Sequence, residues 1–237
     1  MLKRLLKRLL EASGYTVVPD GWSPRRLRRP GFAPRVVVDV GVASGTARLY
    51  QAFPEAYFLL IEALGENEPH LREILHRYRG DYVIAAAGAS QGKGIINVEP
   101  VQQGRGSSLL TRTAQTSKGV RLERREVPIE TLDSLVAGRH LQGPFGLKID
   151  TEGFELEVIR GATNLLRETQ FVLAEVSVIE RFEGSYSFSD FIAAMSEREF
   201  ELSDVLSVGR SRGKAIHIDA LFTPRAPTPG ATGSKSR

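Results

Sequence analysis

One stretch constrains the fold of this chain more than any other: the apolar run VVV at residues 36–38 leads directly into DVGVASG at residues 39–45. A second apolar run, residues 57–61, ends at Glu62. A buried strand, a glycine-rich turn into a helix and an acid closing the next strand are typical of a nucleoside-binding βαβ unit. The glycines let the backbone approach a ligand closely, and the acid can accept two hydrogen bonds from a ribose diol. The sequence therefore predicts a nucleoside site in an α/β fold.

Strands and helices alternate along most of the remaining sequence. Segments with strand character are separated by segments with helical spacing of apolar residues, which predicts a parallel sheet with helices on both faces. Right-handed crossovers bring the carboxyl ends of such strands to one edge, where ligands bind. The predicted strands are 36–40, 57–62, 82–87, 95–98, 145–149, 171–174, 200–207 and 215–223. The predicted helices are 45–53, 67–78, 132–138, 155–161 and 188–198, the third of them capped by Thr131.

The 237-residue chain contains no cysteine. This excludes disulfides, thiolate metal sites, iron–sulfur clusters and cysteine nucleophiles. No apolar stretch is long enough to span a bilayer, and the N-terminus lacks the apolar core and cleavage site of a signal peptide. We therefore expect a cytoplasmic protein.

The net charge of +4 is unevenly distributed along the chain. Residues 1–35 carry nine Lys and Arg side chains and two acids, whereas residues 223–237 carry three Lys and Arg and no acid. The chain between them is acidic overall, which argues against a nucleic-acid enzyme with a basic groove. We expect three parts: a basic N-terminal helix and linker (1–34), a folded domain (35–223) and a disordered tail (224–237).

The first ten residues, MLKRLLKRLL, have leucines at helical spacing with basic residues between them. Such a helix either makes a weak contact with a membrane surface or packs its leucines on its own domain or on a second subunit. Ten residues bury little apolar area, which favours packing within the protein, and a homodimer is one form of it.

Acidic residues lie at or near the carboxyl ends of four of the predicted strands. Asp39 lies in the first strand before Gly41, Glu62 ends the second, Asp150 follows strand 145–149, and Glu175 follows strand 171–174. Because the carboxyl ends of parallel strands meet at one edge of a sheet, we expect these acids to lie close together. Glu152, two residues after Asp150, and Lys148, two residues before it, belong to the same predicted site.

The spacing of the glycines does not match a dinucleotide site. The dinucleotide fingerprint is G-x-G-x-x-G, whereas this turn is Gly41-x-x-x-Gly45, with Ala43 at the middle glycine position. The preceding acid, Asp39, is unfavourable beside a pyrophosphate but suits a ligand with an amino group or a sulfonium. S-adenosylmethionine has a ribose diol, an ammonium group and no phosphate, so the acidic turn favours it over NAD.

Motifs of several other enzyme classes are absent from the sequence. It contains no phosphate-binding G-x-x-x-x-G-K-[ST] loop, no G-x-S-x-G nucleophile turn and no pair of histidines at zinc spacing. The four histidines are scattered, and we interpret them as surface or packed residues. One of them, His217, lies near Asp219 in a predicted strand.

Five segments together resemble the FkbM-type methyltransferases, a family within the Rossmann-like S-adenosylmethionine-dependent methyltransferases. The segment LKIDTEGFELEVIRGA is the most specific, because a glycine turn alone occurs in many nucleotide-binding folds. The segments are VVVDVGVASG (36–45), FLLIEAL (58–64), IETLDSL (129–135), LKIDTEGFELEVIRGA (147–162) and IDALF (218–222).

The resemblance implies a class I methyltransferase fold: a seven-stranded, mostly parallel sheet with helices on both faces and an antiparallel last strand. It implies that residues 35–223 form a methyltransferase domain that binds S-adenosylmethionine and methylates a hydroxyl of a sugar or other small natural product. The turn would hold the methionine side, Glu62 the ribose, and Ala86 and Ala87 the adenine. The predicted cofactor-binding residues are Asp39, Gly41, Ala43, Ser44, Gly45, Glu62, Ala63, Ala86 and Ala87.

The resemblance also has a departure. The family often has Asn where this chain has Ala43, so one hydrogen bond to the cofactor is either missing or made through water. Ser107 and Ser108 match a serine pair of the family, and we include them with Lys148 and Glu175 as predicted substrate-binding residues. The polar segment 102–119 around the two serines is long and aperiodic, which is typical of a lid.

Asp150 and Glu152 are the predicted catalytic residues. An alcohol nucleophile has a high pKa and needs a general base or a metal as it attacks, so one of these carboxylates would take the proton. Alternatively, the two bind a divalent cation, so the need for a metal stays open. Glu152 can instead have a structural role at the start of the following helix, where an acid is favourable.

Two other functions remain open at this point. The first is an NAD-dependent Rossmann oxidoreductase, which the glycine spacing and the lack of a Tyr-x-x-x-Lys motif disfavour. The second is a catalytically degenerate methyltransferase fold that only binds. The acids Asp39, Glu62, Asp150 and Glu152 argue against degeneration, whereas Ala43 leaves it open. We expect a small-molecule hydroxyl acceptor and no nucleic-acid partner, but fold does not identify the acceptor.

Overall fold

The computed structural model describes residue 13 and the ranges 22–99, 106–117, 119 and 121–225. The leucine-rich residues 1–10 and most of the predicted tail lie outside the described residues. Pro224 and Arg225, which the sequence assigned to that tail, belong to the folded part: Pro224 ends a strand, and the Arg225 amide donates a hydrogen bond to the Glu199 carbonyl.

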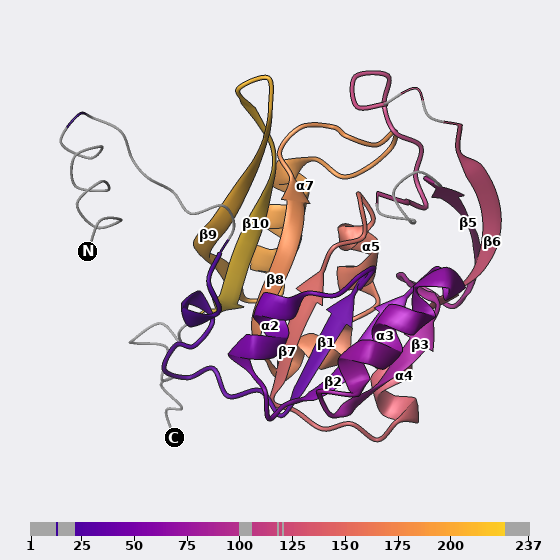
Figure 1. Cartoon of the computed structure of the whole chain (residues 1–237). Coiled ribbons are helices and arrows are strands. Elements are labelled where there is room, and N and C mark those ends of the chain that lie inside the picture. Colours follow the sequence, from indigo (N-terminus) through magenta and orange to yellow (C-terminus); the bar gives the residue numbers. More distant parts are fainter. Residues whose placement is uncertain (1–12, 14–21, 100–105, 118, 120, 226–237) are drawn as a thin grey trace, which may run out of the picture.

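A seven-stranded sheet forms the centre of the described chain, in the order β3-β2-β1-β7-β8-β10-β9 (Figure 1). The strand β10 runs antiparallel to both of its neighbours, whereas the other neighbouring strands are parallel. The strands are β1 (Val36–Val40), β2 (Tyr57–Glu62), β3 (Gly80–Ile84), β7 (Phe145–Ile149), β8 (Thr169–Ser177), β9 (Phe200–Ser211) and β10 (Lys214–Pro224). The predicted class I methyltransferase sheet, with its antiparallel last strand, is confirmed.

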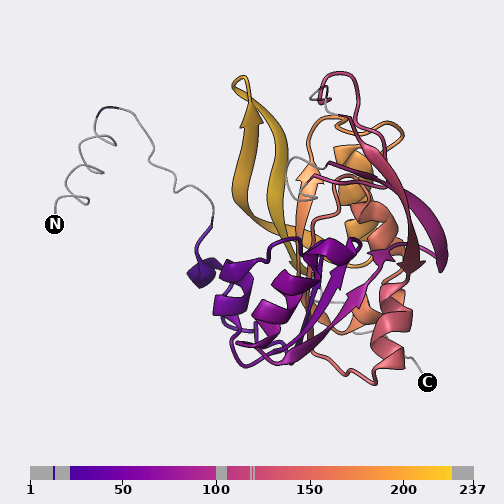
Figure 2. The ribbon, with the colours of Figure 1, turned by 45° about the vertical axis from the view of Figure 1, so that its right-hand side comes forward.

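The strand order reverses direction between β1 and β7. From β1 the chain builds outward through β2 and β3, and from β7 it builds outward on the other side through β8. Crossovers leave the sheet in opposite directions at such a point, so a crevice opens beyond the carboxyl ends of the two central strands. The β9–β10 hairpin and the β5–β6 pair extend past this edge on either side of it (Figures 1 and 2).

Helices cover both faces of the sheet, because the central strands are apolar on both sides. In β1 every residue is buried: Val36, Val38 and Val40 face one apolar cluster and Val37 faces the other. The first cluster packs against α4 (Leu132–Gly138), α5 (Glu155–Arg160), α6 (Thr163–Arg167) and α7 (Phe188–Glu197). The second packs against α2 (Ala47–Ala52) and α3 (Glu68–Leu75), which follows the 3-10 turn η2 (Gly65–Asn67).

The helices begin and end close to where the sequence predicted them. The side chain of Thr131 accepts a hydrogen bond from the Ser134 amide, as expected for the residue that caps α4. Helix α6 was not predicted from the sequence. None of the helices in the described part of the chain is long and apolar enough to cross a membrane.

A second, three-stranded sheet lies beside the first and corrects one predicted strand. The sequence predicted a single strand over residues 82–87, but β3 ends at Ile84 and the next two residues pair with a different sheet. This sheet has the order β4-β6-β5, with β4 (Ala86–Ala87), β5 (Gly92–Val98) and β6 (Glu123–Glu130). The break turns Ala86 and Ala87 across the carboxyl edge of the large sheet, because their partner is β6 rather than β2.

The basic segment before β1 packs against the domain. Trp22 and Leu27 are buried in the second apolar cluster, on either side of the 3-10 turn η1 (Pro24–Arg26). Arg26 and Arg29 both form ion pairs with Asp204 of β9. Residues 22–34 are therefore attached to the folded core, although the sequence assigned them to a linker outside it; the reason is that their basic side chains find an acidic partner 175 or more positions away.

Gly41 should be intolerant of any side chain. It has a φ of +73°, and a Cβ there would lie 1.8 Å from the carbonyl oxygen of Asp150. The left-handed backbone alone costs about 1–2 kcal/mol for other residues, so Gly41→Ala should lower the free energy of unfolding by more than about 2 kcal/mol. Gly138→Ala is the matched control, since its Cβ would meet nothing within 4 Å. Equal urea midpoints for the two variants would contradict this account of the turn.

Candidate functional site

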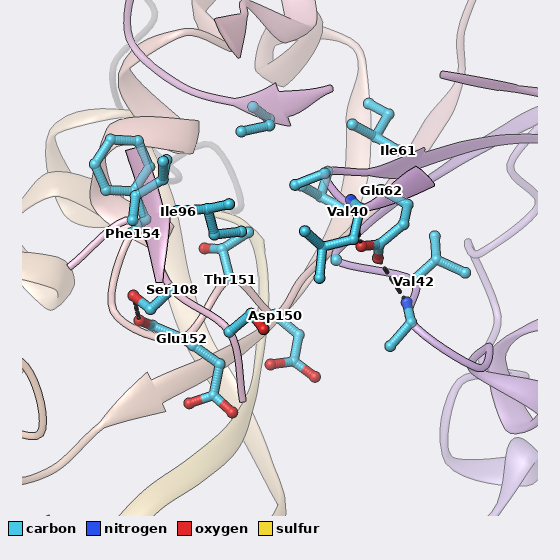
Figure 3. Close-up of a pocket in the computed structure, with 18 of the residues that line it drawn as sticks. Val40, Val42, Ile61, Glu62, Ile96, Ser108, Asp150, Thr151, Glu152 and Phe154 are labelled. Atoms are coloured by element: carbon cyan, nitrogen blue, oxygen red, sulfur yellow. Dashed lines mark hydrogen bonds between the residues drawn. The ribbon is translucent and has the colours of Figure 1, made fainter. Parts of the chain in front are cut away.

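A cavity of about 420 Å³ opens at the carboxyl ends of β1, β2 and β7 (Figure 3). The glycine-rich turn, residues 41–46, forms one part of its wall. Ala63, the residues 85–87 and Ile96 of β5 contribute apolar surface, and Asp150, Glu152 and Glu175 contribute carboxylates. A volume of this size falls within the range of about 300–1,000 Å³ that is usual for small-molecule sites.

The cavity brings together nearly all the residues predicted from the sequence. Eight of the nine predicted cofactor residues line it, and so do both predicted catalytic acids. The four predicted substrate residues, Lys148, Glu175, Ser107 and Ser108, line it as well. Strand order explains this convergence, because each of these residues lies at or near the same edge of the two sheets.

Glu62 holds the glycine turn from the end of β2. Its Oε2 accepts a hydrogen bond of 2.8 Å from the Ala43 amide, and its Oε1 accepts bonds from the Leu64 amide at 2.9 Å and from Asn67 Nδ2 at 3.1 Å. Ala43 has a φ of +46°, a conformation that asparagine tolerates better than alanine. The carboxylate therefore both lines the cavity and stabilises the strained turn beside it.

Asp39 corrects the sequence-based prediction, because its side chain does not line the cavity. The carboxylate is completely buried beneath it, where it accepts a 2.6 Å hydrogen bond from the Tyr50 hydroxyl and lies 3.1 Å from Lys148 Nζ. Burial, together with the negative charge of Asp39, raises the pKa of Tyr50, so this phenol stays protonated as a donor. Asp39 thus supports the site from behind.

Three carboxylates lie close together just beyond the C-terminal end of β7. Asp150 follows β7, Glu152 lies in the turn before α5 with a φ of +53°, and Glu175 lies within β8 rather than after it as predicted. One carboxylate oxygen from each lies within 4.8 Å of the others. Asp150 and Glu152 point the same way in Figure 3. Asp150 is the most open of the three, with 39% of its side chain exposed.

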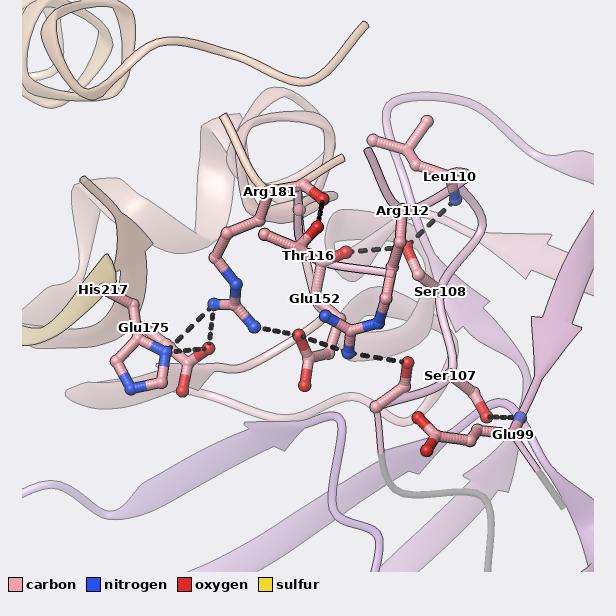
Figure 4. A network of polar contacts seen from close by, with 12 residues as sticks. Glu99, Ser107, Ser108, Leu110, Arg112, Thr116, Glu152, Glu175, Arg181 and His217 are labelled. Atoms are coloured by element: carbon pink, nitrogen blue, oxygen red, sulfur yellow. Dashed lines mark hydrogen bonds and ion pairs between the residues drawn. The ribbon is translucent and has the colours of Figure 1, made fainter. Parts of the chain in front are cut away.

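Arg181 connects this cluster, and the sequence analysis did not identify it. Its guanidinium forms ion pairs with Glu152 and with Glu175 Oε1, the latter at 2.5 Å (Figure 4). Arg112 adds a second contact to Glu152 at 3.5 Å. Both arginines stack over the ring of Phe182, which aligns them toward the acids. They come from irregular segments without a motif, so only the folded chain reveals them.

His217 is a packed residue, one of the two positions that the sequence allowed for it, and the side chains it packs against belong to the cluster. Its Nδ1 lies 3.0 Å from Glu175 Oε1 and 3.0 Å from Arg181 Nη1 (Figure 4). The antiparallel pairing of β10 with β8 produces this contact, because it sets His217 opposite Ser177, two residues along β8 from Glu175 and on the same face of the sheet. Spacing along the sequence could not indicate it.

The three acids differ in their proton affinity. Although part of the Asp150 side chain is open to the cavity, its desolvation by the surrounding protein, together with the charges of Glu175 and Glu152, raises its pKa well above the usual value despite the neighbouring Lys148. Burial also raises the pKa of Glu152 against the opposing charge of Arg181. Burial would raise the pKa of Glu175 too, but hydrogen bonds and charge from His217 and Arg181 outweigh it and lower the pKa to about 2. Of the three, Glu175 is therefore the acid held most firmly as a carboxylate, whereas Asp150 and Glu152 hold protons more tightly than ordinary acidic side chains.

The charge balance of the cluster bears on the metal alternative. A divalent cation between the three acids would share Glu152 and Glu175 with Arg181, and would lie close to the Lys148 ammonium 3.8 Å from Asp150. The cations of the chain already neutralise these acids, so the residues present do not favour a metal site.

The segment from residue 106 to 117 is anchored on both sides, although the sequence predicted a lid over 102–119. Ser108 pairs with Asn97 through two backbone hydrogen bonds, and its hydroxyl donates to the Glu152 carbonyl at 2.6 Å. Farther along, the Thr113 amide donates to the Arg181 carbonyl at 3.0 Å. The Ser107 hydroxyl accepts a bond from the Glu99 amide. This part of the segment forms a fixed wall of the cavity.

A second cavity, of about 330 Å³, adjoins the first. Lys148, Asp150 and Glu175 line both, and so do Gly45 and Thr46. The second cavity lies between the carboxyl ends of β7 and β8, the middle of the antiparallel β10 and the start of α2, and Trp22 contributes to its wall. Glu152 lines only the first cavity.

Comparison with known proteins agrees with this geometry. A family model described as the methyltransferase FkbM domain matches residues 39–202. A hexuronic acid methyltransferase of Haloferax volcanii is 26% identical over 186 residues, which are 71% of this chain and 73% of the relative.

Solved structures of similar fold include a ribosomal protein L11 methylase of Lactobacillus delbrueckii subsp. bulgaricus, with 13% identity, a TM-score of 0.46 and coverage of 84% of this chain and 75% of that one. Another is the 1,6-didemethyltoxoflavin-N1-methyltransferase of Burkholderia thailandensis, with 11% identity, a TM-score of 0.46 and coverage of 86% and 76%.

Glu175 should stabilise the fold in a pH-dependent way. Its pKa is about 2 in the folded chain and about 4.3 when unfolded, so its stabilising effect is fully present above about pH 5 and is lost as the pH falls through about 2. The loss in free energy of unfolding caused by Glu175→Gln, at most about 3 kcal/mol near neutral pH, should therefore shrink between these limits. Urea unfolding at a series of pH values measures it. Glu73→Gln, in an exposed ion pair with Arg77, is the control and should change stability little at any pH.

Proposed function

The chain belongs to the FkbM methyltransferase family, and we propose that it transfers the methyl group of S-adenosylmethionine to an oxygen of a sugar or a related hydroxylated small molecule. Membership makes it an S-adenosylmethionine-dependent methyltransferase. The choice of oxygen as the acceptor atom is supported by the acid cluster, and the choice of a sugar by the hexuronic acid methyltransferase among its relatives.

The larger cavity has the chemistry that S-adenosylmethionine requires. Glu62 would bind the ribose hydroxyls, and Ala86 and Ala87 with Ile96 would contact the adenine. Gly41, Ala43, Ser44 and Gly45 would follow the methionine part. Lys148 is the single basic residue lining this cavity in the described chain, and its ammonium already donates to the Gly41 carbonyl at 2.8 Å. A cationic ligand without phosphates suits such a wall better than NAD does.

When bound, S-adenosylmethionine supplies a methyl group activated by its sulfonium. The residues of this chain would align the acceptor hydroxyl with that methyl group, and alignment of the two reactants can supply much of the reduction in barrier. As the oxygen–carbon bond forms and the carbon–sulfur bond breaks, the electron pair of the broken bond stays on sulfur and the hydroxyl proton passes to a carboxylate. S-adenosylhomocysteine, the methylated acceptor and a protonated acid are then the products.

Asp150 is the base that the geometry supports best. Its side chain is the most open of the three acids, and its raised pKa makes it a better proton acceptor than an ordinary aspartate. Glu152 is committed to Arg181 and Arg112, and Glu175 to Arg181 and His217. We therefore assign to Glu152 the positioning of Arg181, and to Glu175 the positioning of both Arg181 and the acceptor. Ser107 and Ser108 stay candidate contacts to the acceptor from the wall of the larger cavity.

The cofactor assignment is tested by isothermal titration with S-adenosylmethionine, S-adenosylhomocysteine and NAD. We expect micromolar dissociation constants for the two adenosyl compounds and no heat from NAD. Incubation with S-adenosylmethionine and a panel of sugars should then give products heavier by one methyl group, with an O-methyl signal by NMR. Binding of NAD alone would overturn the proposal. Binding of the cofactor without any methylated sugar would restrict the failure to the acceptor class.

The base assignment predicts a characteristic pH profile. Since Asp150 must be ionised to accept a proton, kcat should fall as the pH is lowered, with a midpoint above the ordinary aspartate pKa of about 3.9. Asp150→Asn should lower kcat by about 10²–10⁴-fold and abolish that acidic limb. Glu152→Gln is the matched comparison: it should retain the limb and lose less activity. A larger loss in Glu152→Gln, with unchanged cofactor affinity, would make Glu152 the base instead.

A further inference from the structure

The cavity beside the cofactor cavity has no role in the function proposed above. It is separated from the larger cavity only by residues that line both, among them Lys148, Asp150 and Glu175. Its volume of about 330 Å³ suffices for a small ligand such as one sugar ring. The proposed base is thus shared by two adjoining cavities, and Glu152 belongs to only one of them.

In-line transfer of a methyl group requires two adjoining binding spaces, one for the donor and one for the acceptor. The acceptor oxygen has to approach the methyl group from the side opposite the sulfur, so donor and acceptor occupy separate spaces that meet at the reacting atoms. The acids at the meeting point are Asp150 and Glu175. An acceptor bound in the second cavity would have the Asp150 carboxylate at its border with the cofactor.

The wall of the second cavity combines an aromatic surface with carboxylates. Trp22 is fixed in the second apolar cluster and only 7% exposed, so the part of its indole that lines the cavity is held rigidly. Asp219 lies on β10, where its Oδ2 accepts a hydrogen bond from the Ser207 hydroxyl at 2.5 Å. It is paired with Glu175 across the β8–β10 ladder. Aromatic surface with a few convergent polar groups is the usual composition of a small-molecule site.

We propose that this second cavity is the acceptor subsite, in which a sugar ring packs against Trp22 and its hydroxyls donate hydrogen bonds to Asp219 and Glu175. The proposal rests on the methyl transfer proposed above and names where its substrate binds. It also gives the segment before β1 a function, because Trp22 lies in the part that the sequence assigned to a linker. The starting residues of α2 complete the subsite, with Ala47 exposed at its rim.

The single tryptophan of the chain makes the subsite observable without any mutation. The full chain is saturated with S-adenosylhomocysteine and then titrated with methyl glycosides of glucose, galactose, mannose and glucuronic acid while the Trp22 emission is recorded. Each sugar is also assayed for methylation with S-adenosylmethionine. We expect a methylated sugar to change the emission saturably, with a half-saturation concentration that matches its KM.

Two exposed alanines provide a matched pair of variants. Ala47→Phe places a ring in the second cavity and should raise the KM of the sugar by about tenfold or more, while the dissociation constant of S-adenosylhomocysteine stays within about twofold of wild type. Ala137→Phe, on the exposed side of α4 and outside both cavities, should change neither value. Thermal melting of both variants checks that they fold.

The outcomes separate the subsite from the chemistry. A sugar that is methylated but leaves Trp22 emission and the KM of Ala47→Phe unchanged overturns the subsite, and a raised KM in Ser107→Ala would then assign the acceptor to the larger cavity. A sugar that changes the emission saturably without being methylated supports the subsite and overturns the proposed reaction on that sugar. If S-adenosylhomocysteine binds but no sugar changes the emission or is methylated, both the subsite and the sugar acceptor are wrong.

Discussion

The buried ammonium of Lys148 is the interaction on which the site depends. It lies between β1 and β7, where it contacts Asp39 Oδ1 at 3.1 Å and the Gly41 carbonyl at 2.8 Å, and it reaches Asp150 at 3.8 Å. Burial would lower the pKa of Lys148, but the charges of Asp39 and Asp150 outweigh it and the pKa is raised. Removing one partner of such a buried pair costs about 3–5 kcal/mol, so the lysine and its acids depend on one another for the stability of the fold. One side chain thereby joins the glycine turn to the proposed base.

The second constraint is the distribution of charge among the acids. Three carboxylates this close repel one another. Arg181 forms ion pairs with Glu152 and Glu175 and offsets this repulsion, whereas Asp150 lies near the more distant Lys148. The same distribution separates their pKa values, so that one acid is kept ionised and another is ready to take a proton. Structure and chemistry are linked here because the ion pairs that hold the loops together also assign the acid–base roles.

The sheet topology explains why two cavities meet at these residues. The order of the strands reverses between β1 and β7, which opens the cofactor cavity on the side of β1 and β2. The antiparallel β10 and the segment around Trp22 enclose a second space on the side of β8. The shared border falls at Asp150 because β7 is the strand that lies between the two sides. In-line transfer between neighbouring cavities is thus compatible with the way the chain folds.

The sequence by itself determined the parallel sheet, the glycine turn, Glu62 and the acids after β7, because each of these is encoded in a local run of residues with a fixed period or motif. It did not determine that Asp39 turns away from the cavity, that residues 82–87 divide between two sheets, or that Trp22 joins the core. The contacts of Arg181 and His217 with the acids could not be predicted either, since no local pattern specifies which distant charges meet. Pairing of β8 with β10 and the packing of loops decided those positions, and with them the acid–base character of the site.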